Sequence, residues 1–131
     1  MKPIRCLYPG SRLKISDNSG VKEVEIISFK KKTGGDVRKR RSSGGLGDIC
    51  SCAMKKGVVK FKKKILSCLI VQQKVPFKKK NGERYLFRNN LGILLLEDTK
   101  KPIATKINCF VPVELKEFFP KVVSISRGII F

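Results

Sequence analysis

Lysine and arginine dominate the chemistry available to this chain. Its 131 residues include 30 Lys and Arg but only 10 Asp and Glu, which gives a net charge of +20 at pH 7. Ammonium and guanidinium groups bind phosphate oxygens, so a charge excess of this size predicts a polyanionic partner that neutralises it. The alternative is a surface that is charged for solubility alone.

The basic residues are concentrated in one part of the chain. Residues 30–64 contain 13 basic and two acidic residues, a net charge of +11. This asymmetry favours a binding face over uniform solubilisation. The basic residues predicted to contact nucleic acid are Lys30, Lys31, Lys32, Arg38, Lys39, Arg40, Arg41, Lys62, Lys63, Lys64, Lys74, Lys78, Lys79, Lys80, Arg84 and Arg88.

Catalytic and metal-binding side chains are scarce. Histidine is absent, which removes the commonest general base and metal ligand. A nuclease would need clustered carboxylates, yet the only adjacent acids are Glu97 and Asp98. The five cysteines lie mostly in apolar runs and are expected to be buried hydrophobes of a reducing compartment. Cys50 and Cys52 fit strand alternation better than a zinc site. We therefore predict no enzyme, no metal and no cofactor.

Short alternating segments predict the strands that position the basic residues. Residues 13–15 and 21–27 flank a turn signature, which predicts a hairpin. The turn residues are Asp17, Asn18, Ser19 and Gly20, and we expect turn chemistry of them rather than ligand contact. Residues 48–54 predict another strand. Residues 64–71 are almost continuously apolar and predict a central strand buried on both faces.

Two basic projections are predicted between these strands. The loop 30–47 has many glycines and no periodicity, so we expect it to become ordered only against phosphates. The segment 74–88 predicts a second hairpin, with Asn81 and Gly82 at its tip. The three lysines at 78–80 precede this turn and are expected to project together.

The remaining segments predict a mixed C-terminal part. Residues 91–96 predict an apolar strand, and residues 103–111 are moderately strand-like. Proline residues flank 113–119, which predicts a short helix, and residues 121–126 predict a closing strand. We expect one domain over 1–131: a compact, mainly β barrel with basic projections and a short helical C-terminal segment within 112–131. No stretch is long and apolar enough to predict a membrane span.

Five weak motifs in the same order resemble the large-subunit ribosomal protein "L fourteen" family. The resemblance covers roughly residues 12–126. The motifs are Asp17-Asn18-Ser19-Gly20, Gly47-Asp48-Ile49, Asn81-Gly82 followed by Phe87 and Asn90, Pro102-Ile103-Ala104-Thr105-Lys106-Ile107, and Glu114-Leu115 followed by Lys121-Val122-Val123-Ser124-Ile125.

This resemblance implies a five-stranded β barrel with a protruding hairpin and short C-terminal helices. It implies a structural constituent of the large ribosomal subunit that binds large-subunit rRNA near the subunit interface and supports assembly and translation. The implied partners are rRNA, neighbouring large-subunit ribosomal proteins, a small-subunit rRNA bridge and a ribosome-silencing factor, with no membrane. The alternative is a free-standing OB-like nucleic-acid-binding protein.

The chain departs from the family pattern at several positions. Gln72 stands where the family has Arg, Arg88 where it has Asp, and the ending 127–131 differs. The basic loop is also longer than usual. These departures and the excess of 22 Lys over 8 Arg favour an organellar ribosome. Because no leader is recognisable, we predict an organelle-encoded mitochondrial ribosomal protein, with a plastid or a bacterial cytoplasm as alternatives.

Overall fold

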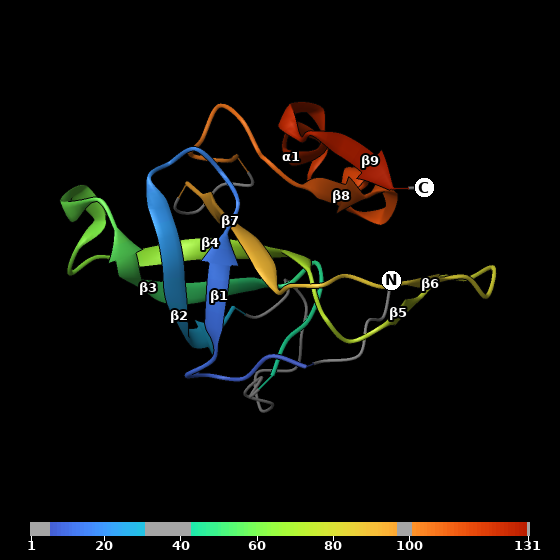
Figure 1. The fold of residues 1–131 in the computed structure, drawn as a ribbon, viewed down its shortest axis with the longest axis horizontal. Coiled ribbons are helices and arrows are strands. Elements are labelled where there is room, and N and C mark those ends of the chain that lie inside the picture. The colour runs from blue at the N-terminus through green and yellow to red at the C-terminus, as the bar shows by residue number, and fades with distance from the viewer. Residues whose placement is uncertain (1–5, 31–42, 97–100, 131) are drawn as a thin grey trace.

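Five strands form a closed barrel in the computed structural model, which describes residues 6–30, 43–96 and 101–130 (Figure 1). The barrel order is β1-β2-β3-β4-β7, with β1 parallel to β7 and the other neighbours antiparallel. The strands are β1 (Arg12–Ile15), β2 (Val21–Phe29), β3 (Ile49–Gly57), β4 (Ile65–Gln72) and β7 (Leu91–Leu95). The mainly β fold and the five-stranded barrel are therefore confirmed.

The hairpin of β1 and β2 turns at Asp17 as predicted. One Asp17 carboxylate oxygen accepts the backbone N–H of Ser19 at 3.0 Å, which closes an Asx turn. The other oxygen accepts the backbone N–H of Leu94 in β7 at 3.0 Å. Gly20 has a φ of +96°, a left-handed conformation that glycine adopts without strain. Asp17 therefore shapes the turn and also ties it to the strand that closes the barrel.

The predicted central strand is confirmed as β4, in which Leu66–Val71 are all buried. Leu66, Cys68 and Ile70 belong to one apolar cluster, together with residues of β1, β2 and β3. Leu69 and Val71 belong to a second cluster, together with residues of the C-terminal segment. A strand that is covered on both faces needs apolar residues at every position, which explains the continuous run.

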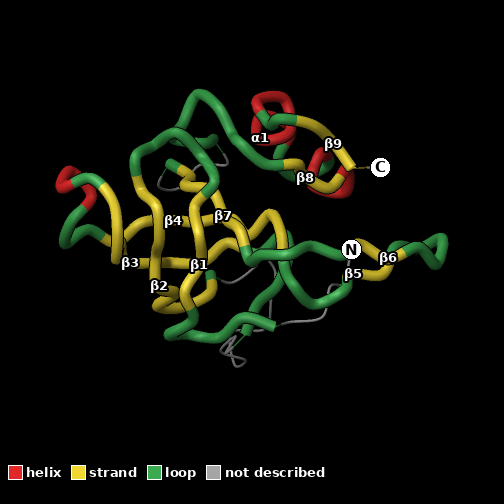
Figure 2. Tube along the Cα trace, in the orientation of Figure 1, coloured by secondary structure: helices red, strands yellow, loops and turns green. Residues whose placement is uncertain are grey.

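The C-terminal segment packs beside the barrel and contains the predicted short helix, although its elements lie at other residues than expected (Figure 2). Its elements are β8 (Phe110–Pro112), the 3-10 helix η2 (Val113–Lys116), the helix α1 (Pro120–Ile125) and β9 (Gly128–Ile130), which pairs with β8 in parallel. The expected strand over 103–111 is wrong except at its end. In place of the expected helix over 113–119 the structure has only the short 3-10 helix η2. The expected closing strand over 121–126 is wrong, because these residues form most of α1. Pro120 begins a helix because its missing N–H is not needed at the first helical position.

The basic hairpin, residues 74–88, extends away from the barrel (Figure 1). Its strands are β5 (Phe77–Lys78) and β6 (Arg84–Tyr85). Asn81 and Gly82 lie at the tip as predicted, but the loop has three residues. The backbone N–H of Gly82 donates to the Lys79 carbonyl at 3.1 Å, and Gly82 has a φ of +92°. A turn followed by a left-handed glycine is the usual three-residue hairpin loop.

Within the described residues, no helix has the length and apolarity that crossing a membrane requires. The same part of the chain contains no group of three or more Cys, Asp or Glu side chains able to hold a metal ion.

All five cysteines are free thiols. Cys50, Cys52 and Cys68 are fully buried in the barrel, Cys109 is buried, and Cys6 is partly exposed. Burial raises the pKa of the Cys109 and Cys6 thiols, and hydrogen bonds to Cys50 and Cys52 together with burial raise that of Cys68. Strand alternation therefore explains the spacing of Cys50 and Cys52.

We expect a soluble thiol reagent at neutral pH to modify Cys6 first and the four buried cysteines only when the protein unfolds. The reacting species is the thiolate, which is scarce when the pKa is raised and the sulfur is covered. Mass spectrometry of the labelled peptides, with and without denaturant, measures this order. Rapid labelling of Cys50 or Cys68 in the native protein would contradict the buried assignment.

Candidate nucleic-acid interface

Ten of the sixteen predicted RNA contacts lie in the described residues. Lys31, Lys32, Arg38, Lys39, Arg40 and Arg41, together with most of the predicted loop 30–47, lie outside them. Lys30, at the end of β2, is only partly exposed, and its ammonium group donates to the Ser67 hydroxyl of β4 at 2.6 Å. Exposed predicted contacts are Lys62, Lys63, Lys64, Lys74, Lys78, Lys80, Arg84 and Arg88.

The first basic cluster is the β3–β4 tip, which we define as residues 58–65. It contains the 3-10 helix η1 (Val59–Phe61) and then three exposed lysines at 62–64. Phe61 is 9% exposed and belongs to the barrel core, which anchors the tip. Lys60 is also exposed, with its ammonium group 5.7 Å from the Phe61 ring centroid. The prediction missed Lys60, although it directly precedes the same basic run.

The second basic cluster is the basic hairpin, where the three consecutive lysines do not behave alike. Lys78 and Lys80 are exposed, but the Lys79 side chain is only 10% exposed. Its ammonium group lies 4.4 Å from the Tyr85 ring centroid and 3.7 Å from the Glu83 carboxylate. The expectation that all three lysines project together is wrong for Lys79. A cation over an aromatic face is attracted by the ring quadrupole, which holds Lys79 against the hairpin.

An aromatic stack fixes the base of this hairpin. The Tyr85 ring stacks between Phe77 and Phe87, with centroid distances of 5.6 and 5.8 Å. The Tyr85 hydroxyl lies 2.8 Å from the Glu114 carboxylate and 3.0 Å from the Ile130 carbonyl, which are both acceptors. Burial, followed by the hydrogen bond to Glu114, raises the pKa of Tyr85. The basic hairpin is thus held to η2 and β9 rather than attached only by its two ends.

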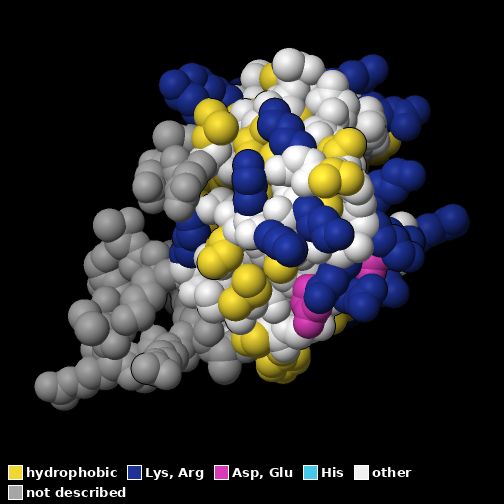
Figure 3. All heavy atoms as spheres, turned by 90° about the vertical axis from the view of Figure 1, so that its left-hand side faces the viewer, with side chains coloured by type: hydrophobic (Ala, Val, Ile, Leu, Met, Phe, Trp, Pro, Cys, Tyr) yellow, Lys and Arg dark blue, Asp and Glu magenta, His cyan; other side chains and the backbone are white. Residues whose placement is uncertain are grey.

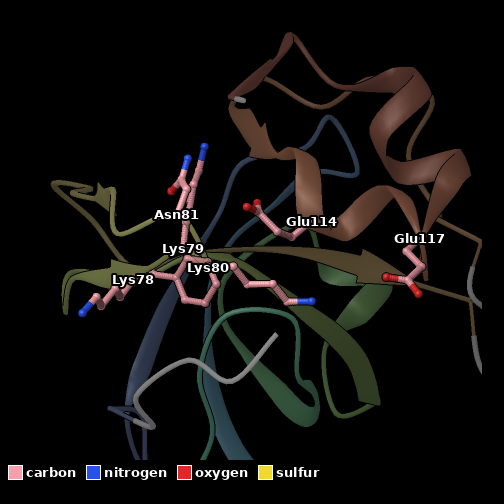
Figure 4. A pocket seen from close by; sticks show the side chains of 7 residues that line it. Lys78, Lys79, Lys80, Asn81, Glu114 and Glu117 are labelled. Atoms are coloured by element: carbon pink, nitrogen blue, oxygen red, sulfur yellow. The ribbon is translucent and has the colours of Figure 1, made fainter.

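A groove of about 970 Å³ lies between the basic hairpin and η2 (Figure 4). Glu114 and Glu117 line one side of it, and Lys80 extends toward that side while Lys78 points the opposite way (Figure 4). Carboxylates repel phosphates, so this groove is a poor site for a nucleic-acid backbone. The side of the hairpin that carries Lys78 is the better one.

Ion pairs neutralise part of the barrel's basic surface. Glu23 pairs with Arg12 at 3.2 Å and with Lys56 at 3.8 Å, and Glu25 pairs with Lys55 at 2.9 Å. The bond to Lys55 lowers the pKa of the Glu25 carboxyl. None of the lysines at 60 and 62–64 forms an ion pair in the part of the chain that the structure describes. Figure 3 shows the face that carries η1, where basic side chains are widespread and acidic ones are few.

Two of the departures from the family pattern make contacts within the protein. The Gln72 side-chain amide donates to the Phe110 carbonyl at 2.8 Å, so this position helps to hold the C-terminal segment. The altered ending contains β9, which pairs with β8, and the Arg127 guanidinium lies 5.7 Å from the Phe110 ring centroid. Residues 127–130 are therefore packed against the rest of the C-terminal segment.

Comparison with known proteins gives consistent matches along nearly the whole chain. A family model described as "Ribosomal protein L14p/L23e" matches residues 6–130. A protein of Methanocorpusculum labreanum named "Large ribosomal subunit protein uL14" is 36% identical over 126 residues, covering 96% of this chain and 93% of the relative. Proteins with the same name from Methanoregula boonei and Methanocella arvoryzae are 33% and 32% identical, covering 98% and 96% of this chain and 96% and 93% of the relatives.

Proposed function

The chain belongs to the ribosomal protein L14p/L23e family, and from this premise we propose that it binds large-subunit rRNA through the β3–β4 tip and the basic hairpin. Membership makes it a structural component of the large ribosomal subunit with a role in translation. The same membership confirms the prediction that the chain is not an enzyme, because the family is a structural one.

One observation carries the proposed RNA contact. The exposed lysines of the tip, and Lys78 on the side of the hairpin that faces away from Glu114 and Glu117, form no ion pair among the described residues. Lysines bind phosphates as point charges and fix the position of a protein on RNA without reading its sequence. The barrel and the Tyr85 stack hold both clusters in place, so recognition would follow RNA shape.

The proposal extends to partners that the resemblance implies. We infer that neighbouring large-subunit ribosomal proteins, a small-subunit rRNA bridge and a ribosome-silencing factor contact this protein, and that residues 1–131 act as one domain. The remaining predicted contacts, Lys31, Lys32, Arg38, Lys39, Arg40 and Arg41, belong to the same proposal. The ribosome is the proposed location. The relatives named above are archaeal, so the expected mitochondrial origin has no support from them.

A free-standing OB-like binder is disfavoured by the hairpin's aromatic residues as well as by the family. That class stacks bases on exposed aromatic rings. Here Phe77 and Tyr85 are buried and Tyr85 stacks on both neighbouring rings.

Sedimentation tests the proposed function. The chain, carried with a small affinity tag in cells of its source, should sediment in sucrose gradients with large subunits and with whole ribosomes. Washing the subunits with concentrated salt should release it, because the contacts are electrostatic. A chain that stays at the top of the gradient at low salt would refute the ribosomal role.

Alanine substitutions should separate the three hairpin lysines. Lys78→Ala should reduce the slope of log affinity against log salt by about one, because it removes one phosphate contact. Lys80→Ala should reduce it less, because Lys80 extends toward the carboxylates of Glu114 and Glu117. Lys79→Ala should leave the slope unchanged, because its ammonium group is held by Tyr85 and Glu83. Fluorescence anisotropy with labelled rRNA fragments at several salt concentrations measures the slopes.

Lys22→Ala is the matched control, since Lys22 is exposed on β2 outside both clusters. The assignment of Lys79 would be wrong if its replacement changed the slope as much as that of Lys78.

A further inference from the structure

Aliphatic side chains are unusually exposed on the β3–β4 tip. Val59 is 81% exposed, Ile65 is 75% exposed and Val58 is 48% exposed. Val59 begins η1 and Ile65 is the first residue of β4, so in the sequence of the tip they precede and follow the three consecutive lysines. Large exposed apolar side chains that gather at one place mark an interaction site rather than ordinary surface.

The tip holds these side chains in a fixed place. The backbone N–H of Val58 donates to the Gly20 carbonyl at 3.3 Å. A Cβ atom at Gly20 would lie 2.5 Å from Val58 Cγ2, so Val58 packs directly on the turn before β2. Phe61 fills the barrel core below, and Ile65 pairs with Ala53 of β3. The exposure of Val59 and Ile65 therefore belongs to the folded tip.

The charge around these side chains selects the partner. Residues 55–65 contain six lysines and no acid. The lysines at 60 and 62–64 form no ion pair within the described ranges. On the face that carries η1, hydrophobic side chains lie among basic ones (Figure 3). RNA can bind both kinds of side chain, because its phosphates attract the lysines and the ribose and base edges between the phosphate rows present C–H groups to the aliphatic side chains.

We propose that Val59 and Ile65 form an apolar contact with RNA, packing on ribose and base edges while the flanking lysines bind phosphates on either side. This inference rests on the proposed function and assigns the tip a second kind of contact. The wide, shallow minor groove of an A-form helix is the surface that such short side chains reach. An apolar contact displaces no counterions, so its contribution does not depend on salt.

Two double variants separate the apolar contact from the electrostatic one. Val59→Thr with Ile65→Thr preserves β-branching while it removes apolar surface, and we expect it to lower affinity about tenfold at every salt concentration without changing the slope. Lys62→Gln with Lys64→Gln should reduce the slope by about two. Ile27→Thr is the matched control, since Ile27 is an exposed β-branched residue outside the tip, and should bind as the unaltered protein does.

The probe is a set of transcribed fragments that tile the large-subunit rRNA, and thermal melting confirms that each variant is folded. Unchanged affinity of the Thr pair, with a reduced slope of the Gln pair, would overturn the apolar contact and leave the proposed function intact. Unchanged slopes for the Gln pair as well would overturn RNA binding by the tip altogether. A Thr pair that binds RNA normally but fails to enter large subunits would show that a protein covers the tip, which also overturns the inference.

Discussion

Raising the monovalent salt concentration from about 50 mM to about 200 mM should weaken binding to rRNA fragments by a factor between about 250 and about 1,000. Eight predicted contacts are exposed in the described residues. If about six of them bind phosphates, the slope of log affinity against log salt is about −4 to −5, because each contact releases a condensed counterion. No other effect expected of this protein changes its binding as much.

Titrations of labelled rRNA fragments at four or more salt concentrations measure this slope. Polyglutamate of matched length is the control for attraction to any polyanion, and its affinity should be far lower because it lacks the spacing of an RNA backbone. A slope near zero would contradict an electrostatic mechanism. The protein would then have to hold RNA through neutral contacts, such as the apolar one proposed for Val59 and Ile65.

The barrel could be predicted because its local signals agree with its tertiary structure. Apolar and polar residues roughly alternate in β2 and β3, so each of these strands turns its apolar side chains inward. The continuous apolar run in β4 is buried on both faces of the strand. The turn at Asp17 has side chains that bond their own backbone, so no distant contact is needed to recognise it. The number of barrel strands came only from the family resemblance, and the order of the strands with closure by β7 was not predicted.

The C-terminal segment could not be predicted because tertiary packing decides it. The β-branched residues Val122 and Val123 favour a strand, yet both are buried on α1 against the second apolar cluster. Pro120 can end one helix or begin another, and the sequence does not distinguish these cases.

The basic clusters were recognised by composition, but the role of each lysine was not. Lys79 differs from Lys78 only because strand alternation turns it toward Tyr85, and nothing in a run of three lysines reveals that. The aliphatic side chains of the tip were missed for a related reason. A valine next to lysines looks like part of a strand until its exposure is known.

Asp17→Ala should lower the free energy of unfolding by about 3 kcal/mol, because it leaves two backbone N–H donors without their hydrogen-bond acceptor. These are the N–H of Ser19 in the turn and the N–H of Leu94 in β7, and Asp17 is only 9% exposed. β1 and β7 share only two residue pairs in parallel register, Lys14 with Leu91 and Ile15 with Gly92. The barrel is therefore closed by a short ladder that the Asp17 carboxylate extends.

Urea unfolding measures this loss as a lower midpoint with an unchanged slope. Asn18→Ala is the matched control. Its amide nitrogen donates to the Thr105 hydroxyl at 3.0 Å and its amide oxygen accepts the backbone N–H of Lys106 at 3.3 Å. Both partners are exposed and water can replace these bonds, so the loss should cost about 1 kcal/mol or less. Equal losses for the two variants would mean that the turn alone matters and that the bond to Leu94 contributes little. A much larger loss for Asp17→Ala would show that Asp17 serves barrel closure through Leu94 as well as the turn through Ser19.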